Sequence, residues 1–215
     1  MRNVKKKNLC AAFCCLAAFM LWTLGVCSID VQPIGPRSSP VGFAAVNRFV
    51  HSLTGVHPVL YRITDWLGLV PILIAVGFAV CGLIQWIRKK SLLQVDRSIL
   101  VLGGFYLAVM AVYLFFELVV VNYRPVLIDG CLEASYPSST TMLVMCVLPT
   151  AVMQFNTHIK HRWWKRCTAA VISGFAVFMV AGRLISGVHW FSDIVGGVLL
   201  SAGLIKLYAA VSELK

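Results

Sequence analysis

The chain has 215 residues, of which 60% are hydrophobic and 13% are charged, and its mean hydropathy is +0.85. This composition excludes an ordinary soluble domain and is typical of a protein that crosses a membrane several times. The net charge of +11 would also suit a nucleic-acid-binding protein. However, the basic residues lie in short clusters between apolar runs and form no continuous basic stripe. We therefore predict a membrane protein that has the lipid bilayer, and no nucleic acid, as a partner.

Six apolar runs have about the length of a membrane-spanning helix, which needs roughly 20 apolar residues to cross the hydrocarbon core. The runs are 8–28, 66–87, 98–121, 141–157, 167–183 and 191–212. The first run follows a basic start, as a signal peptide does. Its apolar core is long, and Val26 stands where a cleavage site needs a small residue, so we favour an uncleaved helix. The sequence predicts an all-α, multi-pass membrane helix bundle of about six transmembrane helices, formed as a single domain over residues 1–215.

The placement of Lys and Arg predicts the orientation of the bundle. Most of the 19 basic residues fall at the amino terminus, in 88–97, in 158–166 and in the tail. The others are Arg37, Arg48, Arg62, Arg124 and Arg183. Because cytoplasmic loops carry the excess of Lys and Arg, both termini should be cytoplasmic. The compact loops and short termini indicate the plasma membrane of a bacterium.

The longest outer stretch, 29–65, contains a loop and a predicted short helix. The segment Asp30 to Pro40 is rich in Pro, Gly and Ser and reads as a loop. The segment Val41 to Leu60 has apolar residues at helical spacing and predicts an amphipathic helix at the outer surface. We expect Asp65 to cap the second span.

The cysteines give no metal-binding pattern. Their spacing matches no zinc site, and most lie in apolar runs, so we expect them to be small buried residues of the bundle. They are Cys10, Cys14, Cys15, Cys27, Cys81, Cys131, Cys146 and Cys167. A disulfide between Cys27 and Cys131, both near the outer side, stays open as the less favoured alternative.

Polar residues from three segments are expected to meet at the outer face. Arg183, His189 and Asp193 lie within eleven residues of one another, between the last two spans. Ionisable groups at membrane depth are candidate functional residues, and the His–Asp spacing of four places both on one helix face. Arg124 follows the third span, and Tyr136-Pro137-Ser138-Ser139-Thr140 opens the fourth. Arginine is well suited to hold a phosphate, and a histidine held by a carboxylate can act as a nucleophile.

These residues resemble the type 2 phosphatidic acid phosphatase (PAP2) superfamily, the membrane relatives of the vanadium haloperoxidases. The family has three motifs: Lys, six residues, Arg-Pro; then Pro-Ser-Gly-His; then Ser-Arg, five residues, His, three residues, Asp. Arg124-Pro125 matches the end of the first motif, and Pro137-Ser138 begins the second. Gly182-Arg183, His189 and Asp193 match the third with its spacing. The segments Val41-Gly-Phe and Thr64-Asp-Trp-Leu-Gly are also similar to the family.

The resemblance implies a hydrolase that works through a phosphohistidine and needs no metal or other cofactor. His189 would be the nucleophile and Asp193 its orienting partner. Arg124 and Arg183 would clamp the phosphoryl oxygens. Ser138 would add a donor together with the backbone amides of Ser139 and Thr140, at a helix amino terminus that favours anions.

Two positions depart from the family pattern. The lysine of the first motif falls at Glu117, which we expect to pair with an arginine instead. The histidine of the second motif, which is the general acid for the leaving alcohol, falls at Thr140, and threonine cannot play that role near neutral pH. Because a phosphate monoester leaves with far less help than an alkoxide, we expect a polyprenyl diphosphate to be preferred over phosphatidate. As an alternative, another outer-loop residue supplies the proton, and the candidates are Asp129, Glu133 and Tyr136.

Three functions stay open at this point. The favoured one is a membrane lipid phosphatase whose substrate is a lipid phosphate or a polyprenyl diphosphate. The second is a phosphotransferase that passes the phosphoryl group to another lipid, and the third is a catalytically weak lipid-binding or transport protein. The remaining histidines, His51, His57, His158 and His161, are expected to be structural.

Overall fold

The described part of the chain is all-helical. A computed structural model describes residues 2–212, without the side chains of Arg2 and His158. Its α-helices are α1 (Arg2–Ser28), α2 (Ala44–Thr54), α3 (Pro58–Leu67), α4 (Leu69–Lys89), α5 (Arg97–Leu118), α6 (Ser139–His158), α7 (Arg162–Ile185) and α8 (Phe191–Ser212), with short 3₁₀ turns at Pro36–Ser38 and Leu92–Gln94. Six helical segments are long and apolar enough to cross a membrane, with α3 and α4 together forming the segment Pro58–Lys89. The predicted fold class is confirmed.

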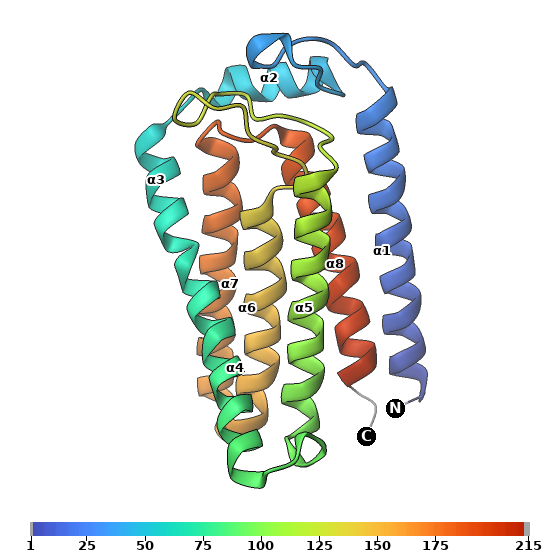
Figure 1. Ribbon diagram of the computed structural model, residues 1–215, viewed down its shortest axis with the longest axis vertical. Helices are drawn as coiled ribbons and strands as arrows, with labels where there is room; N and C mark the ends of the chain where they lie inside the picture. The colour runs from blue at the N-terminus through green and yellow to red at the C-terminus, as the bar shows by residue number, and fades with distance from the viewer. Residues whose placement is uncertain (1, 213–215) are drawn as a thin grey trace.

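The long helices run alongside one another, and α2 crosses one end of the bundle (Figure 1). Helix α6 is central and contacts α4, α5, α7 and α8, while α1 packs mainly on α8. The beginning of α1 and the end of α8 lie at the same end, together with the loops 90–96 and 159–161 (Figure 1). The opposite end, called here the outer end, carries α2, the loop 119–138 and the turn 186–190 (Figure 1). The basic clusters of the sequence thus gather at the end away from α2.

The predicted outer helix is shorter in the structure than its apolar pattern suggested. Helix α2 ends at Thr54 and is followed by Gly55, which has a φ of 67°. The chain restarts as α3 with Pro58 in its first turn. Glycine tolerates that left-handed conformation, and proline suits the first turn of a helix. The expectation that Asp65 caps the second span is wrong. Asp65 lies inside the Pro58–Lys89 segment, which begins earlier than the sequence indicated.

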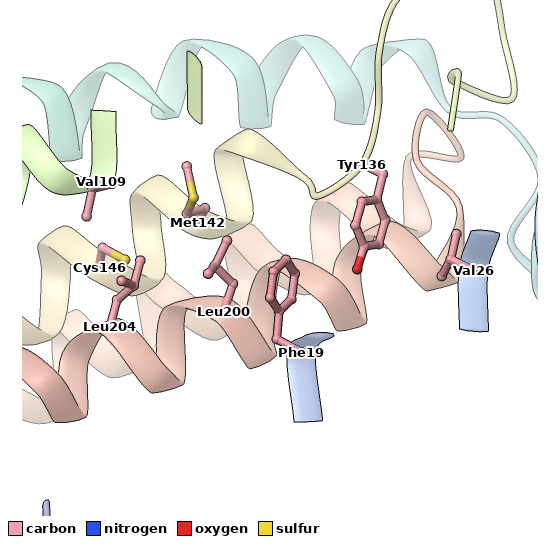
Figure 2. Close-up of a cluster of buried hydrophobic side chains, with 8 residues drawn as sticks. All are labelled: Phe19, Val26, Val109, Tyr136, Met142, Cys146, Leu200 and Leu204. Carbon is pink, nitrogen blue, oxygen red and sulfur yellow. The ribbon is translucent and has the colours of Figure 1, made fainter. Parts of the chain in front are cut away.

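A cluster of buried hydrophobic side chains lies between α1, α5, α6 and α8. Figure 2 shows this cluster of buried side chains, which comprises Phe19, Val26, Val109, Tyr136, Met142, Cys146, Leu200 and Leu204. Close approach to α8 depends on small residues, as is usual between membrane helices. A Cβ atom on Gly203 would lie 2.7 Å from the Leu16 side chain, and one on Gly196 would lie 2.6 Å from the Tyr136 ring. Trp22 Nε1 also donates to the Ser192 carbonyl at 3.1 Å, which ties α1 to the beginning of α8.

The cysteines correct one sequence expectation. All eight thiols are free, and Cys146 is buried, but Cys10, Cys14, Cys27, Cys81 and Cys131 are exposed. The expectation that most of them are buried is therefore wrong. A helix in a membrane can be apolar on every face, so hydropathy does not distinguish a core position from a lipid-facing one.

A large apolar cavity lies between α4, α5 and α6. Its volume is about 970 Å³. Trp86 and Leu92 line it near the inner end of the bundle, while Tyr113, Ser139 and Thr140 line it near the outer end. We call this space the α4–α6 groove. It extends along the bundle from the inner loop to the first turn of α6.

Candidate active site

The polar residues singled out by the sequence meet at the outer end of the bundle. Arg124 is carried by the loop between α5 and α6, His189 by the turn between α7 and α8, and Arg183 by the last turn of α7. Asp193 lies in the first turn of α8. All four are buried, with exposed fractions of 8% for Arg124, 2% for Arg183, 3% for His189 and 0% for Asp193. Such burial of ionisable groups is costly unless they are paired or functional.

The contacts of His189 define its tautomer. Arg124 Nη1 lies 3.3 Å from His189 Nε2. A guanidinium can only donate, so Nε2 must be the accepting nitrogen and the proton must sit on Nδ1. Nδ1 in turn lies 3.7 Å from Asp193 Oδ2. His189 therefore presents the lone pair of Nε2 toward Arg124, with a carboxylate behind its protonated nitrogen.

The Asp193 carboxylate is fixed by donors on both oxygens. Oδ2 accepts from the backbone N–H of Trp190 at 2.9 Å, and Oδ1 accepts from Asn122 Nδ2 at 3.1 Å. Such partners hold the carboxylate in place and orient the imidazole that it faces. The backbone carbonyl of Asn122 accepts hydrogen bonds from the Ser135 N–H and from the Ser135 hydroxyl. These bonds join the two sides of the 119–138 loop next to the site.

Arg124 is placed by a hairpin in that loop. Bridges pair Tyr123 with Ala134 and Ile128 with Cys131, and the turn contains Asp129 and Gly130 with φ of 48° and 77°. An Asp-Gly pair with positive φ is a typical tight hairpin turn. Arg124 consequently lies opposite Glu133, whose carbonyl accepts its N–H at 3.0 Å and whose Oε2 lies 3.0 Å from its Nε. This ion pair orients the guanidinium while leaving Nη1 directed at His189.

Arg183 is held from the α3 side. Its Nη1 lies 3.5 Å from Asp65 Oδ1, and its guanidinium carbon lies 4.9 Å from the centre of the Tyr61 ring, within the range of a cation–π contact. Its buried Nε has no hydrogen-bond partner among the described residues. A buried donor without a partner is suited to receive an anionic ligand.

Burial and the two arginines keep His189 neutral. Burial lowers the pKa of His189 well below its usual range, and the positive charges of Arg124 and Arg183 lower it further. The backbone of Ser135 opposes this effect and raises the pKa. A neutral imidazole has a free lone pair at neutral pH, which a nucleophile or a base requires.

The start of α6 combines a helix cap with part of the groove wall. Ser138 is the N-cap residue, and its hydroxyl accepts from the Thr141 N–H at 3.4 Å. The Ser138 N–H donates to the Asp193 carbonyl at 3.1 Å, which brings this turn against the start of α8. Ser139 and Thr140 form the first turn of α6 and line the groove. Ser138 is therefore the residue of this motif with a direct contact to Asp193, through backbone atoms.

The residues considered as replacements for the missing lysine and histidine of the family motifs differ in their distance from the site arginines. The ion pairs of the two site arginines are with Glu133 and Asp65, so the expected pairing of Glu117 with an arginine is not present among the described residues. Asp129 is exposed at the hairpin tip. The Tyr136 hydroxyl lies 2.6 Å from Thr23 Oγ1, toward α1, and burial raises its pKa. Glu133 is the one of the three proposed proton donors that contacts a site arginine.

The other histidines lie outside this constellation. His51 Nε2 lies 3.2 Å from the Gly187 carbonyl, and its ring packs on Trp190. His57 Nε2 lies 2.7 Å from the Thr54 carbonyl, and His161 is exposed at the start of α7. The side chain of His158 lies outside the described residues. The contacts of His51 and His57 are those of structural residues.

Sequence reasoning missed the partners that come from distant segments. Neither Asn122, which stands two residues before Arg124, nor Asn47 of α2 is singled out from the sequence. Asp65 was assigned a local capping role, yet it pairs with Arg183 across 118 residues of sequence. The Asp129-Gly130 pair was the available signal for the hairpin that sets Glu133 opposite Arg124.

Comparison with known proteins gives a family and a fold. A family model described as the PAP2 superfamily matches residues 101–214. Among solved structures, the chain is similar to the first transmembrane PAP2 type phosphatidylglycerolphosphate phosphatase from Bacillus subtilis, with a TM-score of 0.65 and 17% sequence identity. That match covers 95% of this chain and 98% of the other. Comparison with curated protein sequences gives no significant match.

Proposed function

Because the chain belongs to the PAP2 superfamily, we propose that it removes a phosphate from a membrane lipid through a phosphorylated His189. The observation that carries this proposal is the contact of Arg124 Nη1 with His189 Nε2, backed by Asp193 on the other side of the ring. His189 Nε2 faces Arg124, and the charges of both Arg124 and Arg183 act on the His189 ring. A tetrahedral phosphoryl group next to Nε2 would meet a nucleophile and the positive charge that its transition state needs.

In the first step, the Nε2 lone pair of His189 forms a bond to phosphorus, and the bond from phosphorus to the leaving oxygen breaks. Formation of the P–N bond makes the imidazole cationic. The Asp193 carboxylate stabilises that charge and keeps the proton on Nδ1, as the aspartate of a catalytic triad does. Arg124 exchanges its contact with Nε2 for a phosphoryl oxygen, and Arg183 binds another through its unpartnered Nε.

In the second step, water attacks phosphorus from the side that the leaving group has vacated. The P–N bond breaks, His189 recovers its neutral ring, and the proton lost by water ends on the released phosphate. The Asp193 carboxylate is already held by two hydrogen bonds and the Arg124 guanidinium by its ion pair with Glu133, which limits the reorganisation that the steps need.

Thr140 supports a substrate with a good leaving group. Expulsion of an alkoxide needs a proton, and general acid catalysis typically contributes about 10²- to 10⁴-fold. A phosphate monoester has a second pKa of about 6 and leaves without such help. We therefore propose a polyprenyl diphosphate as the better substrate and a phosphomonoester such as phosphatidate as the poorer one.

The α4–α6 groove supports a lipid as the substrate. Ser139 and Thr140 line its outer end and follow the Ser138 N-cap, whose backbone contacts Asp193. An apolar chain in this groove would thus end next to the proposed phosphate position. The lining is mainly aliphatic and aromatic, with Gly82, Gly103 and Gly104 leaving room between the helices.

We also propose that the site faces the extracytoplasmic side of the plasma membrane. The basic clusters lie at the end opposite α2, and cytoplasmic loops carry the excess of positive charge. A fluorescent protein fused after Lys215 should fold and fluoresce in cells, since it would stay in the cytoplasm. If that fusion does not fluoresce, and alkaline phosphatase fused at the same position is active in the periplasm, the proposed orientation is wrong.

The experiment that tests the function is phosphate release by purified protein from a small lipid panel. The panel contains a polyprenyl diphosphate, phosphatidate and phosphatidylglycerolphosphate, the last because the similar Bacillus subtilis protein is described as its phosphatase. We expect release from at least one lipid, fastest from the diphosphate, and none from the His189→Ala variant. Release by His189→Ala at the wild-type rate would contradict the phosphohistidine. Faster release from phosphatidate than from the diphosphate would contradict the leaving-group argument alone.

The role of Thr140 has its own test. Thr140→His should raise turnover of phosphatidate by roughly 10²-fold, the lower end of general acid catalysis, and change the diphosphate rate little. Thr140→Gln is the matched control, since it adds a side chain of similar size that cannot donate an acidic proton. An equal gain from both variants would show that space at this position, and not proton donation, limits the reaction.

A further inference from the structure

We propose that Asn47 of α2 is a positioning residue for His189, because it caps the helix that begins directly after the proposed nucleophile. Asn47 lies outside residues 101–214, which the family model matches. Its side chain touches none of the reacting groups and acts through Ser192 and the start of α8. The proposal rests on the phosphatase function for its kinetic consequences, but not for its structural ones.

Both polar atoms of the Asn47 side chain, Oδ1 and Nδ2, form hydrogen bonds. Oδ1 accepts from the backbone N–H of Ser192 at 3.0 Å. Nδ2 donates to the Ser192 hydroxyl at 2.9 Å and to the Gly42 carbonyl at 2.7 Å. The residue is completely buried, so these bonds are not exchanged for bonds to water, and the amide has one orientation that satisfies all of them.

Within the first turn of α8, Asp193 accepts the Trp190 N–H, whereas the Ser192 N–H is accepted by a residue of another helix. The helix begins at Phe191, so the position before it belongs to Trp190, whose side chain offers no hydrogen-bond acceptor. The first N–H groups of a helix have no partner within the helix. An asparagine is a favoured N-cap residue when it is local. Here Asn47 supplies the same oxygen from another helix, 145 residues away in sequence.

The cap is connected to the Asp193 carboxylate through shared partners. The Ser192 hydroxyl, which accepts from Asn47, also accepts from Asn122 Nδ2 at 3.3 Å. The same Nδ2 donates to Asp193 Oδ1. Ser192 therefore joins Asn47 to the group that orients the imidazole. Loss of Asn47 would release the first turn of α8, and with it both Asp193 and the turn that carries His189.

A second contact from α2 reaches the other side of the same turn. His51 follows Asn47 by four residues and so lies on the same face of the helix. Its Nε2 lies 3.2 Å from the Gly187 carbonyl, and its ring lies 5.4 Å from that of Trp190. Gly187 itself has a φ of 70°, and a Cβ atom there would lie 1.9 Å from the Gly55 carbonyl oxygen. Helix α2 thus holds residues 187–192 at both ends.

The kinetic test compares Asn47→Leu with the control Ser52→Ala, an exposed position on the same helix. Leucine fills the space of asparagine and removes the acceptor. We expect kcat of Asn47→Leu to fall on the order of 10²-fold, the loss typical of a small misplacement of a catalytic group, with KM nearly unchanged. Ser192→Ala keeps the backbone N–H that donates to Asn47 Oδ1 and removes only the hydroxyl that accepts from Asn47 Nδ2 and Asn122 Nδ2, so its loss of kcat should be smaller than that of Asn47→Leu. Asn47→Asp keeps an oxygen that accepts the Ser192 N–H and should retain a higher kcat than Asn47→Leu. It serves as the test variant if Asn47→Leu does not fold.

A structural readout separates this proposal from the proposed function. In ¹⁵N-histidine NMR spectra of the protein in detergent, the ring signals of His189, assigned with His189→Gln, should shift and broaden in Asn47→Leu but not in Ser52→Ala. A chain without phosphatase activity would still show this change. The NMR result therefore tests the role of Asn47 independently of the proposed phosphatase function. Unchanged His189 signals together with wild-type kcat would overturn the proposal. A lower melting temperature with unchanged kcat and signals would also overturn it, since the role would then be stability alone.

Discussion

The two sides of this bundle differ in how their helices are packed. Helix α8 is buried along most of its length, from Ser192 to Ala210, against α1 and α6. Helix α4 buries Pro71, and between α4, α5 and α6 lies the groove of about 970 Å³. His189 and Asp193 belong to the well-packed side, which on the proposed function would hold the reacting groups in place. The loosely packed side would then supply the apolar space for a lipid chain.

The contrast suggests a division of work along the first turn of α6. On one face of that turn, Ser138 contacts Asp193 through its backbone, and on the other, Ser139 and Thr140 line the groove. A substrate with its phosphate at His189 and its tail in the groove would cross this boundary. Changes on the packed side should then affect every substrate, whereas changes in the groove should affect only substrates with long apolar chains.

The largest effect is expected at Arg183 on the packed side. Arg183→Ala should lower kcat/KM on the order of 10³-fold for all substrates, because it removes charge stabilisation of the transition state. Arg183→Lys should recover little, since lysine lacks the planar fork that binds two oxygens. Phosphate release is the measurement, and Arg62→Ala, an exposed arginine of α3, is the control. A variant Arg183→Ala within fivefold of wild type would remove Arg183 from the proposed site.

A second prediction concerns the protonation of His189. Its folded pKa lies well below the usual value, first through burial and then through Arg124 and Arg183. The unfolded chain therefore binds the proton more readily, and the stability linked to a neutral His189 is complete above about pH 6.5 and falls as the pH drops toward the lowered pKa. The acid limb of kcat/KM due to His189 should accordingly lie below pH 6.5.

Removal of Arg124 should move that titration in a known direction. Arg124→Gln takes away a nearby positive charge, so the His189 pKa should rise, while kcat/KM falls on the order of 10²-fold through loss of a phosphate donor. NMR titration of the histidine rings is the measurement, and Arg48→Gln on α2 is the control. A His189 pKa that falls or stays constant in Arg124→Gln would contradict the proximity of the two groups in solution.

The groove gives a smaller prediction that is selective for the lipid tail. Gly103 lines the groove, and a Cβ atom there would meet nothing within 4 Å, so Gly103→Leu should fold and occupy part of the space. It should lower kcat/KM about 10-fold for a long-chain substrate, the equivalent of one or two methylene groups excluded from apolar contact, and leave a short-chain analogue unaffected. Val177→Leu, on an exposed face of α7, is the control. Equal losses for both substrates would place the lipid tail elsewhere.

The parts of this molecule that sequence predicted are those fixed by local spacing. Apolar runs predict the spans because a helix satisfies its own backbone in lipid, and local spacing predicts that Arg183, His189 and Asp193 meet in the candidate site. The pairings of Asp65 with Arg183 and of Asn47 with Ser192 join segments more than 100 residues apart. Neither leaves a periodic signal, so both required the folded arrangement. The prediction that most cysteines are buried was wrong for a related reason, because hydropathy is similar on the core and lipid faces of a membrane helix.

The smallest effect is expected at Glu133, and it distinguishes two roles for this residue. Its carboxylate pairs with Arg124 Nε at 3.0 Å, and its side chain is 42% exposed, so the pair should contribute at most about 1 kcal/mol. If Glu133 only orients Arg124, Glu133→Gln should change KM by less than about fivefold and affect diphosphate and phosphomonoester substrates alike. If it protonates the leaving group in place of the family histidine, the same variant should lower turnover of phosphatidate by roughly 10²-fold or more and spare the diphosphate. We expect the first result, because the Glu133 carboxylate is directed at Arg124 Nε, with which it forms an ion pair at 3.0 Å. Kinetics on both substrates are the measurement, with Asp129→Asn at the tip of the same hairpin as the control for changes in loop charge.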